Sequence, residues 1–168
     1  GLKLNIKVAE NPARLIEMLE AGEVDVVAYP IPINNKLKQE VIYCGREDIS
    51  SQVLIQRANK GDKLLTDVTQ LIDKDVYVKP NTKYSERLKN LDEELGGGIH
   101  IQKVENDSIA TEDLIEMVSL GEIPYTISDD NTARLNKTYY WNINVDLKVS
   151  FPQRSSWVVR KSSPDLAK

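Results

Sequence analysis

The chain has 168 residues, of which 40% are hydrophobic and 29% charged, as is usual for a globular domain. Its formal net charge of −4 argues against nucleic acid or an anionic membrane as a partner, because both attract basic surfaces. No apolar run approaches the roughly 20 residues of a membrane-spanning helix. The single cysteine, Cys44, excludes an intrachain disulfide and a thiolate zinc cluster.

The first third of the chain predicts strands on either side of a helix. Residues 2–8 (LKLNIKV) alternate apolar with polar side chains, which predicts a β-strand. Asn11 is then placed to cap a helix with Pro12 at its first position, and this helix ends at Gly22. The apolar run 24–29 predicts a central strand of a parallel sheet, covered on both faces. Further strands are predicted at 40–44 and 52–57.

The rest of the chain continues to alternate helices with strands. Helix starts are predicted at three polar sites: Thr66 or Asp67, Asn81 or Thr82, and Thr111. These helices end near residue 72, at the glycines 96–98 and before Gly121, and a fourth helix is predicted over 131–140. The predicted strands are 75–79, 99–104, 125–128, 145–150 and 156–160. Such alternation predicts an α/β protein with mainly parallel sheets.

Two segments that lie 99 positions apart are nearly the same sequence. LIEMLEAGEVDVVAY (15–29) and LIEMVSLGEIPYTIS (114–128) are identical at six of fifteen positions, and each predicts a helix, a glycine stop and a buried strand. Two copies do not make a solenoid, which needs three or more. They predict two similar lobes, the first built from residues 1–52 and 148–168 and the second from 53–147.

Several stretches resemble one family. GEVDVVAYPIPINNKLKQEVIY, VYVKPNTKYSERLKNL and LIEMVSLGEIPYTISDDNTARL are similar to segments of type II periplasmic solute-binding proteins of family 3. The motif Tyr-Thr-Ile-x-Asp and the C-terminal segment SWVVRKSSPDLAK most resemble the N-terminal binding domain of F-type membrane-bound lytic transglycosylases. This resemblance implies the two-lobed type II fold. Members of the family begin with a strand and a helix before the equivalent of residues 2–8, so it also implies a first lobe truncated at its N-terminus.

The predicted binding residues follow strands, because ligands of open α/β sheets lie outside the carboxyl ends of the strands. The resemblance places Asp129 where an acid meets a ligand's α-ammonium, and it places the 81–82 turn where backbone N–H groups meet an anion. The alternative is that Asp129 and Asp130 only cap the helix that follows them. In a cleft between the lobes, the predicted site residues are Tyr29, Pro32, Asn34 and Lys36 from the first lobe and Asn81, Thr82, Asp129 and Asp130 from the second.

Two positions depart from the family pattern. Leu37 stands where the family has an arginine that pairs with the ligand's carboxylate, a contact that leucine cannot make. Pro32 and Asn34 stand where threonines are usual. These departures favour a modified or peptide-like ligand, or a regulatory role without a ligand, over an ordinary free amino acid.

No catalytic motif is present. The sequence contains no GxSxG, no HExxH and no Glu-Ser pair, and the only histidine, His100, has no second ligand nearby for a metal. We therefore expect a non-catalytic module, without cofactor or metal, that binds or senses a small amino-acid- or peptide-like ligand. The alternative is a regulatory domain of a peptidoglycan lytic transglycosylase whose catalytic domain lies outside this chain.

The resemblance also implies where the protein works and with what. It implies the periplasm or envelope of a Gram-negative bacterium, with a transporter or a downstream catalytic domain as partner and no nucleic acid. If the usual first strand is absent, the predicted strands 2–8 and 24–29 have exposed edges. Such edges pair with other chains, so we expect either a dimer through the first lobe or a poorly ordered first lobe with a weakened site.

Overall fold

Two units make up the protein, which a computed structural model describes for residues 1–11 and 13–168. Unit 1 consists of residues 1–49 and 153–168, and unit 2 of residues 50–152. The lobe boundaries predicted above lay at 52/53 and 147/148. The repeated segments fall in different units and different sheets, since β1 (Val26–Pro32) belongs to one sheet and β6 (Tyr125–Asp129) to the other.

Unit 1 is a three-stranded sheet with one helix. The strand order is β1-β8-β2, where β8 is Gln153–Arg160 and β2 is Val41–Ser50, and β1 runs antiparallel to β8. Helix α1 (Ala13–Glu20) contributes Leu19 to a core shared with Val27, Ile31, Val41 and Val158. Two 3-10 turns complete the unit, η1 (Leu37–Gln39) and η3 (Pro164–Ala167). Asn11 accepts a hydrogen bond from the Arg14 backbone N–H (3.1 Å), as a helix cap does, whereas Pro12 lies outside the described residues.

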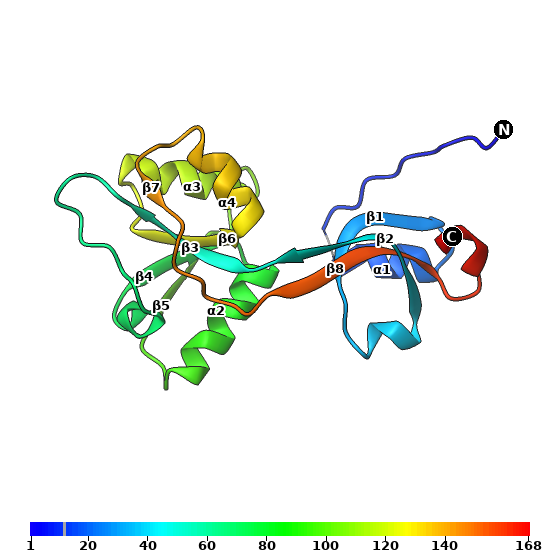
Figure 1. Ribbon diagram of the computed structural model, residues 1–168, viewed down its shortest axis with the longest axis horizontal. Coiled ribbons are helices and arrows are strands. Elements are labelled where there is room, and N and C mark those ends of the chain that lie inside the picture. The colour runs from blue at the N-terminus through cyan, green and yellow to red at the C-terminus, as the bar shows by residue number, and fades with distance from the viewer. Residues whose placement is uncertain (12) are drawn as a thin grey trace. The chain divides into compact units, whose positions relative to one another are not determined.

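Two strand predictions in unit 1 are wrong. Residues 2–8 form no strand and run as a plain trace before α1 (Figure 1), with every apolar side chain at least 80% exposed. The apolar run 24–29 is not a central parallel strand, because β1 lies at the edge of its sheet with the antiparallel β8 as its neighbour. Only Val27 and Ile31 of this strand are buried, whereas Val26 and Tyr29 are exposed.

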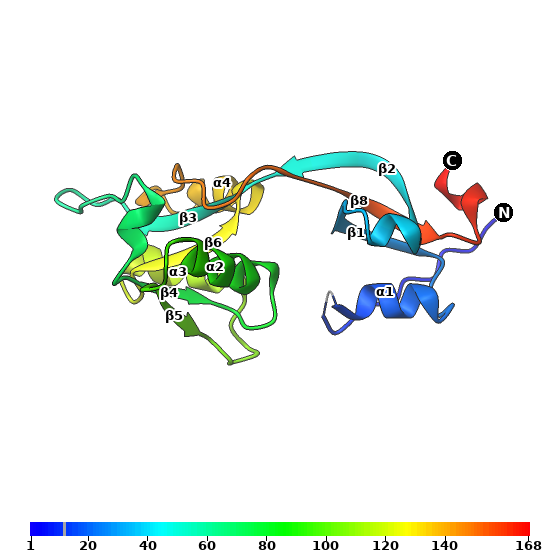
Figure 2. The same cartoon turned by 90° about the horizontal axis from the view of Figure 1, so that it is seen from below.

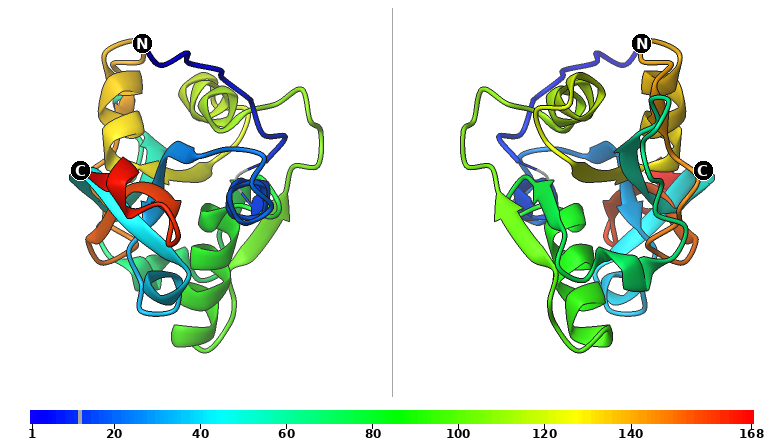
Figure 3. Two further views of the ribbon diagram at one scale, coloured as in Figure 1. Left: turned by 90° about the vertical axis from the view of Figure 1, so that its right-hand side faces the viewer. Right: turned by 90° about the vertical axis from the view of Figure 1, so that its left-hand side faces the viewer.

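Unit 2 is a five-stranded sheet of order β5-β4-β6-β3-β7 with helices on both faces. The remaining bounds are β3 (Gln52–Arg57), β4 (Asp75–Val78), β5 (His100–Lys103), β7 (Ile143–Asn144), η2 (Val68–Leu71), α2 (Lys83–Glu94), α3 (Thr111–Leu120) and α4 (Asp130–Lys137). Helix α2 covers one face, and α3 and α4 cover the other (Figures 1 and 3). The view from below in Figure 2 shows α2 lying beside β4 and β6.

The sheets are less parallel than the alternation of elements predicted. β4 runs parallel to both β5 and β6, but β3 runs antiparallel to β6 and β7. The predicted strand 145–150 is reduced to isolated bonds with β3, such as the one from the Leu54 N–H to the Leu147 carbonyl (2.8 Å). Thr111 is the first residue of α3 rather than its cap, and Asp113 instead accepts a hydrogen bond from the Ala110 N–H (2.7 Å).

In each repeat, an arginine from a neighbouring strand lies at the C-terminal end of the helix. After α1, Arg160 of β8 donates to the backbone carbonyls of Leu19 and Val24. After α3, the guanidinium of Arg57 of β3 lies against Gly121, where a Cβ atom would come within 2.5 Å of Nη1. The two stop glycines, Gly22 and Gly121, have φ angles of 76° and 77°, so both sit in the left-handed region that favours glycine. Cations at helix C-termini also interact favourably with the negative end of the helix dipole.

The two glycines should respond differently to alanine. Gly22→Ala adds only left-handed strain, about 1 kcal/mol, because nothing lies within 4 Å of its Cβ position. Gly121→Ala adds the same strain and also displaces Arg57, so we expect a larger loss in the free energy of unfolding. Urea unfolding with amide exchange resolved for each unit measures both losses, and equal losses would contradict a packed contact between Arg57 and Gly121.

The exposed residues 2–8 should promote self-association. Leu2, Leu4, Ile6 and Val8 alternate with polar residues, and β1 offers a free edge to which a second copy can add this segment as a strand. Sedimentation analysis should show association that increases with concentration and weakens in the double variant Leu4→Lys, Ile6→Lys. The matched control is Leu120→Lys with Leu135→Lys, at exposed positions of unit 2. A monomer whose residues 2–29 are protected from exchange as strongly as residues 75–128 would contradict this expectation.

Candidate functional site

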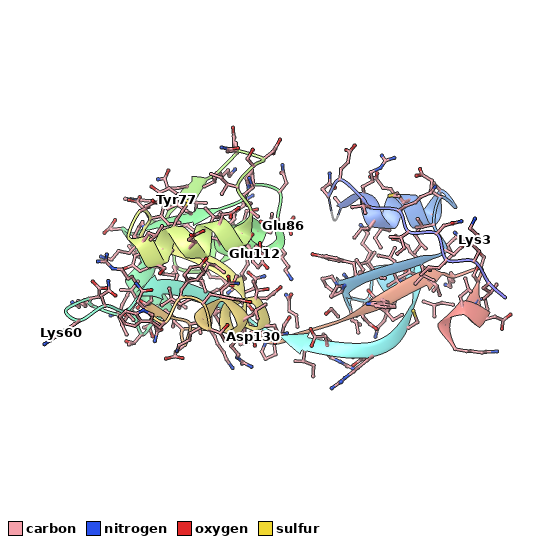
Figure 4. The ribbon with its side chains drawn as sticks, turned by 90° about the horizontal axis from the view of Figure 1, so that it is seen from above. Lys3, Lys60, Tyr77, Glu86, Glu112 and Asp130 are labelled. Atoms are coloured by element: carbon pink, nitrogen blue, oxygen red, sulfur yellow. The ribbon has the colours of Figure 1, made fainter. Side chains whose placement is uncertain are left out.

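Helix N-termini gather at one end of unit 2. β4 and β6 are parallel, so their carboxyl ends share an edge of the sheet, from which the chain enters α2 and α4. Figure 4 shows Glu86, Glu112 and Asp130, from the first turns of α2, α3 and α4, at this same end, while Lys60 lies at the other. This end of an α/β sheet is where ligands bind most often, because backbone N–H groups there are free to meet them.

The predicted turn at 81–82 opens α2. Asn81 has a φ angle of 58°, a left-handed conformation that asparagine tolerates better than most residues. Thr82 is the N-cap: its Oγ1 accepts from the Ser85 N–H (3.3 Å), and the Ser85 Oγ accepts from the Thr82 N–H (3.1 Å). Thr82 also donates its hydroxyl to the Lys79 carbonyl (2.7 Å), which ties the turn to the end of β4.

Asp129, the last residue of β6, meets α2 through two side chains. The Lys83 ammonium lies 2.6 Å from Asp129 Oδ2, and the Tyr84 hydroxyl donates to the same oxygen (3.2 Å). The Asp129 side chain is only 20% exposed, against 39% for Lys83, so the carboxylate is the more enclosed partner. The structure thus brings Asp129 to the predicted turn, and the connection is made by Lys83.

Lys83 and Tyr84 were not predicted as site residues, although the position of Lys83 in the sequence is unusual. It is the first residue of α2, where a cation faces the positive end of the helix dipole. An anion nearby offsets this unfavourable interaction. Asp129 supplies this anion, and the Tyr84 ring centroid lies 5.4 Å from the lysine nitrogen.

Asp129 does not act as a helix cap. It occupies the N-cap position of α4, but its side chain makes no capping hydrogen bond. Asp130 follows as the first residue of α4, with its N–H bound to the Ser51 carbonyl (2.9 Å) and its Oδ2 3.5 Å from Arg134. Within residues 1–11 and 13–168, the other oxygen, Asp130 Oδ1, is buried without a hydrogen-bond partner, and so is Gln52 Oε1 at the start of β3.

The four residues predicted from the first lobe all lie in unit 1, and two of them make local hydrogen bonds there. Tyr29 projects from β1, half exposed, and the Pro32 carbonyl accepts from the Tyr43 hydroxyl (2.7 Å). Asn34 Oδ1 accepts from the Leu37 N–H (2.8 Å), and Lys36 is exposed just before η1. That these four and the four residues of unit 2 bind a ligand stays a prediction.

Leu37, which replaces the family's arginine, has a structural role in unit 1. Leu37 packs against the core of unit 1, so the position that the resemblance assigns to an arginine is apolar and half-buried here. Burial raises the pKa of the Tyr43 phenol, and a backbone hydrogen bond at Asn34 opposes this rise.

A pocket of about 360 Å³ lies at the opposite end of the unit 2 sheet, lined among others by Arg57, Asp62 and Tyr125. The Arg57 guanidinium binds the Asp62 carboxylate through two hydrogen bonds (2.9 and 3.0 Å), and these lower the pKa of Asp62. Burial, followed by the charge of Asp62, raises the pKa of Tyr125. Within residues 1–11 and 13–168 no group of three acidic, histidine or cysteine side chains is arranged to hold a metal.

Comparison with solved structures defines the class of fold. A mutant of ArgBP from T. maritima superposes with a TM-score of 0.72 at 21% identity, over 95% of this chain and 66% of that one. The substrate-binding protein of an amino acid ABC transporter gives a TM-score of 0.71 at 20% identity, over 99% and 70% of the two chains. The chain therefore has the fold of the type II solute-binding proteins, as the sequence predicted.

Comparison with curated proteins is more specific. The chain is 29% identical over 170 aligned residues to the membrane-bound lytic murein transglycosylase F of Desulfosudis oleivorans, covering 99% of this chain and 35% of that protein. The Pseudomonas fluorescens protein of the same name is 26% identical over 161 residues, with 95% and 32% covered. The chain thus spans about a third of the length of these relatives. The resemblance to F-type transglycosylases is confirmed, although no protein-family model matches the chain.

The Thr82 cap should stabilise the site as well as the helix. Thr82→Ala removes the oxygen that accepts from Ser85 and should lower the free energy of unfolding by about 1 kcal/mol. Thr82→Ser keeps that oxygen and should cost much less. Urea unfolding compares the two variants. Equal losses would mean that the threonine methyl group, rather than the cap, stabilises the start of α2.

Proposed function

We propose that this chain is a non-catalytic solute-binding or sensing module for a small amino-acid- or peptide-like ligand. The observation that carries the proposal is the enclosed Asp129 carboxylate, which ends β6 beside the start of α2 and is not used to cap α4. In this position it can accept an ammonium group while the N–H groups of the α2 turn face an anion. The names of the structural neighbours, which include binders of amino acids, support the same class of ligand.

We propose further that the module regulates a peptidoglycan-cleaving enzyme. The likeness to about a third of proteins named membrane-bound lytic murein transglycosylase F favours this over a free transport protein. A catalytic domain would then be the partner, and the cleaved peptidoglycan would supply the peptide-like ligand. The setting would be the periplasmic side of a Gram-negative envelope. No helix in the described part of the chain is long and apolar enough to cross a membrane.

A thermal-shift screen tests the binding proposal. Amino acids, short peptides and muropeptide fragments are offered to the wild type and to Asp129→Asn. A ligand that binds only the folded state, at 100 times its dissociation constant, adds about 2.7 kcal/mol of stability. We expect at least one compound to raise the melting temperature of the wild type and to fail with Asp129→Asn, because the amide carries no charge for the ammonium.

The matched control for this screen is Asp75→Asn. Asp75 begins β4, at the end of that strand away from the site, and pairs with His100 on the surface (3.3 Å). This variant should keep every ligand-induced shift. If Asp129→Asn keeps them too, Asp129 is not part of the site. If no compound shifts the wild type, the module does not bind this class of ligand.

A further inference from the structure

The Asp129 carboxylate already holds an ammonium group, that of Lys83. We propose that Lys83 is a built-in occupant of the site, and that a zwitterionic ligand binds by exchanging this internal ion pair for two new ones. In the exchange the ligand's ammonium takes Asp129, and Lys83 turns to the ligand's carboxylate. This inference rests on the proposed function and specifies which ligands the site accepts.

The contacts of Lys83 are those of a group that can be displaced. Its three N–H donors make one hydrogen bond to the described protein, the one to Asp129 Oδ2, and its side chain is 39% exposed. Lys83 also begins α2, so the helix dipole works against its charge. The pair with Asp129 therefore holds the lysine in place, and a second ammonium group can compete for the same oxygen.

A neighbouring acceptor shows that Lys83 does not fill the site. Gln52 faces Asp129 directly across the ladder of β3 and β6, and such cross-strand pairs have Cβ atoms about 4.5–5.5 Å apart. Gln52 is 4% exposed, yet its Oε1 has no hydrogen-bond partner among the residues that the structure describes. A buried acceptor without a partner is costly and uncommon in folded proteins. A ligand ammonium has donors enough to reach both Asp129 and Gln52.

A second glutamine on the same strand shows what a satisfied position looks like. Gln56 lies four residues along β3, on the same face as Gln52, and is 2% exposed. Its Oε1 accepts from the Leu65 N–H (2.7 Å), and its Nε2 donates to the Leu65 carbonyl (2.9 Å). In the described chain, an unpaired glutamine acceptor is thus found on β3 only at Gln52, at the end of the strand that meets Asp129.

Charge balance selects the class of ligand. An ammonium compound without a carboxylate would expel Lys83 and leave its charge unpaired beside the positive end of α2. A carboxylate without an ammonium would meet a lysine already paired with Asp129. A zwitterion pairs both charges at once, its ammonium with Asp129 and its carboxylate with Lys83. The exchange therefore favours ligands that carry both an ammonium group and a carboxylate group.

Three small probes isolate the two charges: ethylammonium, acetate and glycine. Each is titrated at low ionic strength, where screening is weak, and binding is followed by the backbone amide resonances of residues 83, 84 and 129. The variants are Lys83→Met, with Lys83→Gln as a second replacement should the first disturb the fold. The matched control is Lys79→Met, because Lys79 donates to the Asn106 carbonyl and makes no contact with Asp129.

In the wild type we expect glycine to bind more tightly than ethylammonium or acetate. In Lys83→Met, ethylammonium should gain about fivefold in affinity, the equivalent of one partly exposed ion pair, and glycine should lose its advantage over it. Lys79→Met should match the wild type. Equal affinity for ethylammonium in the wild type and both Lys83 variants would overturn the exchange and leave the proposed function standing. Failure of every probe with the wild type and both Lys83 variants would overturn the exchange, whereas the proposed function is decided separately by the thermal-shift screen.

Discussion

The position of β6 between β4 and β3 governs the rest of unit 2. Its ladder with β3 runs without a break from Gln52↔Asp129 to Gln56↔Tyr125, and its parallel pairing with β4 sets both carboxyl ends at one edge. A slip of one residue would turn every side chain of β6 to the other face. The buried Thr126, Ile127 and Ser128 make such a slip costly, so Asp129 is fixed where α2 begins.

That fixed position explains why α2 can start with a lysine. The cap at Thr82 and the left-handed Asn81 set the direction of the helix, and Lys83 then extends toward a carboxylate that the sheet has placed. The local cost of a cation at a helix N-terminus is offset by a contact from another strand. The proposed site and this stabilising ion pair would share the same carboxylate, that of Asp129.

The two repeats show how one pattern produces two environments. Each forms a helix, a left-handed glycine and a strand, and each helix end receives an arginine from a neighbouring strand. In unit 2 the repeat strand has neighbours on both sides and is buried, whereas β1 has one neighbour and is half exposed. The difference arises from which other strands complete each sheet.

The sequence by itself determined the elements whose causes are local. The glycine stops, a helix cap at Asn81 or Thr82 and the strand 52–57 all follow from residues close together in the chain, and the class of fold followed from the family resemblance. Strand pairing was decided only by tertiary structure, because a pattern such as LKLNIKV makes a strand only when it pairs with a sheet edge, and residues 2–8 pair with no strand in the described part of the chain. The same holds for the ion pair of Lys83 with Asp129: these residues lie 46 positions apart, and only the β4–β6 pairing brings them together.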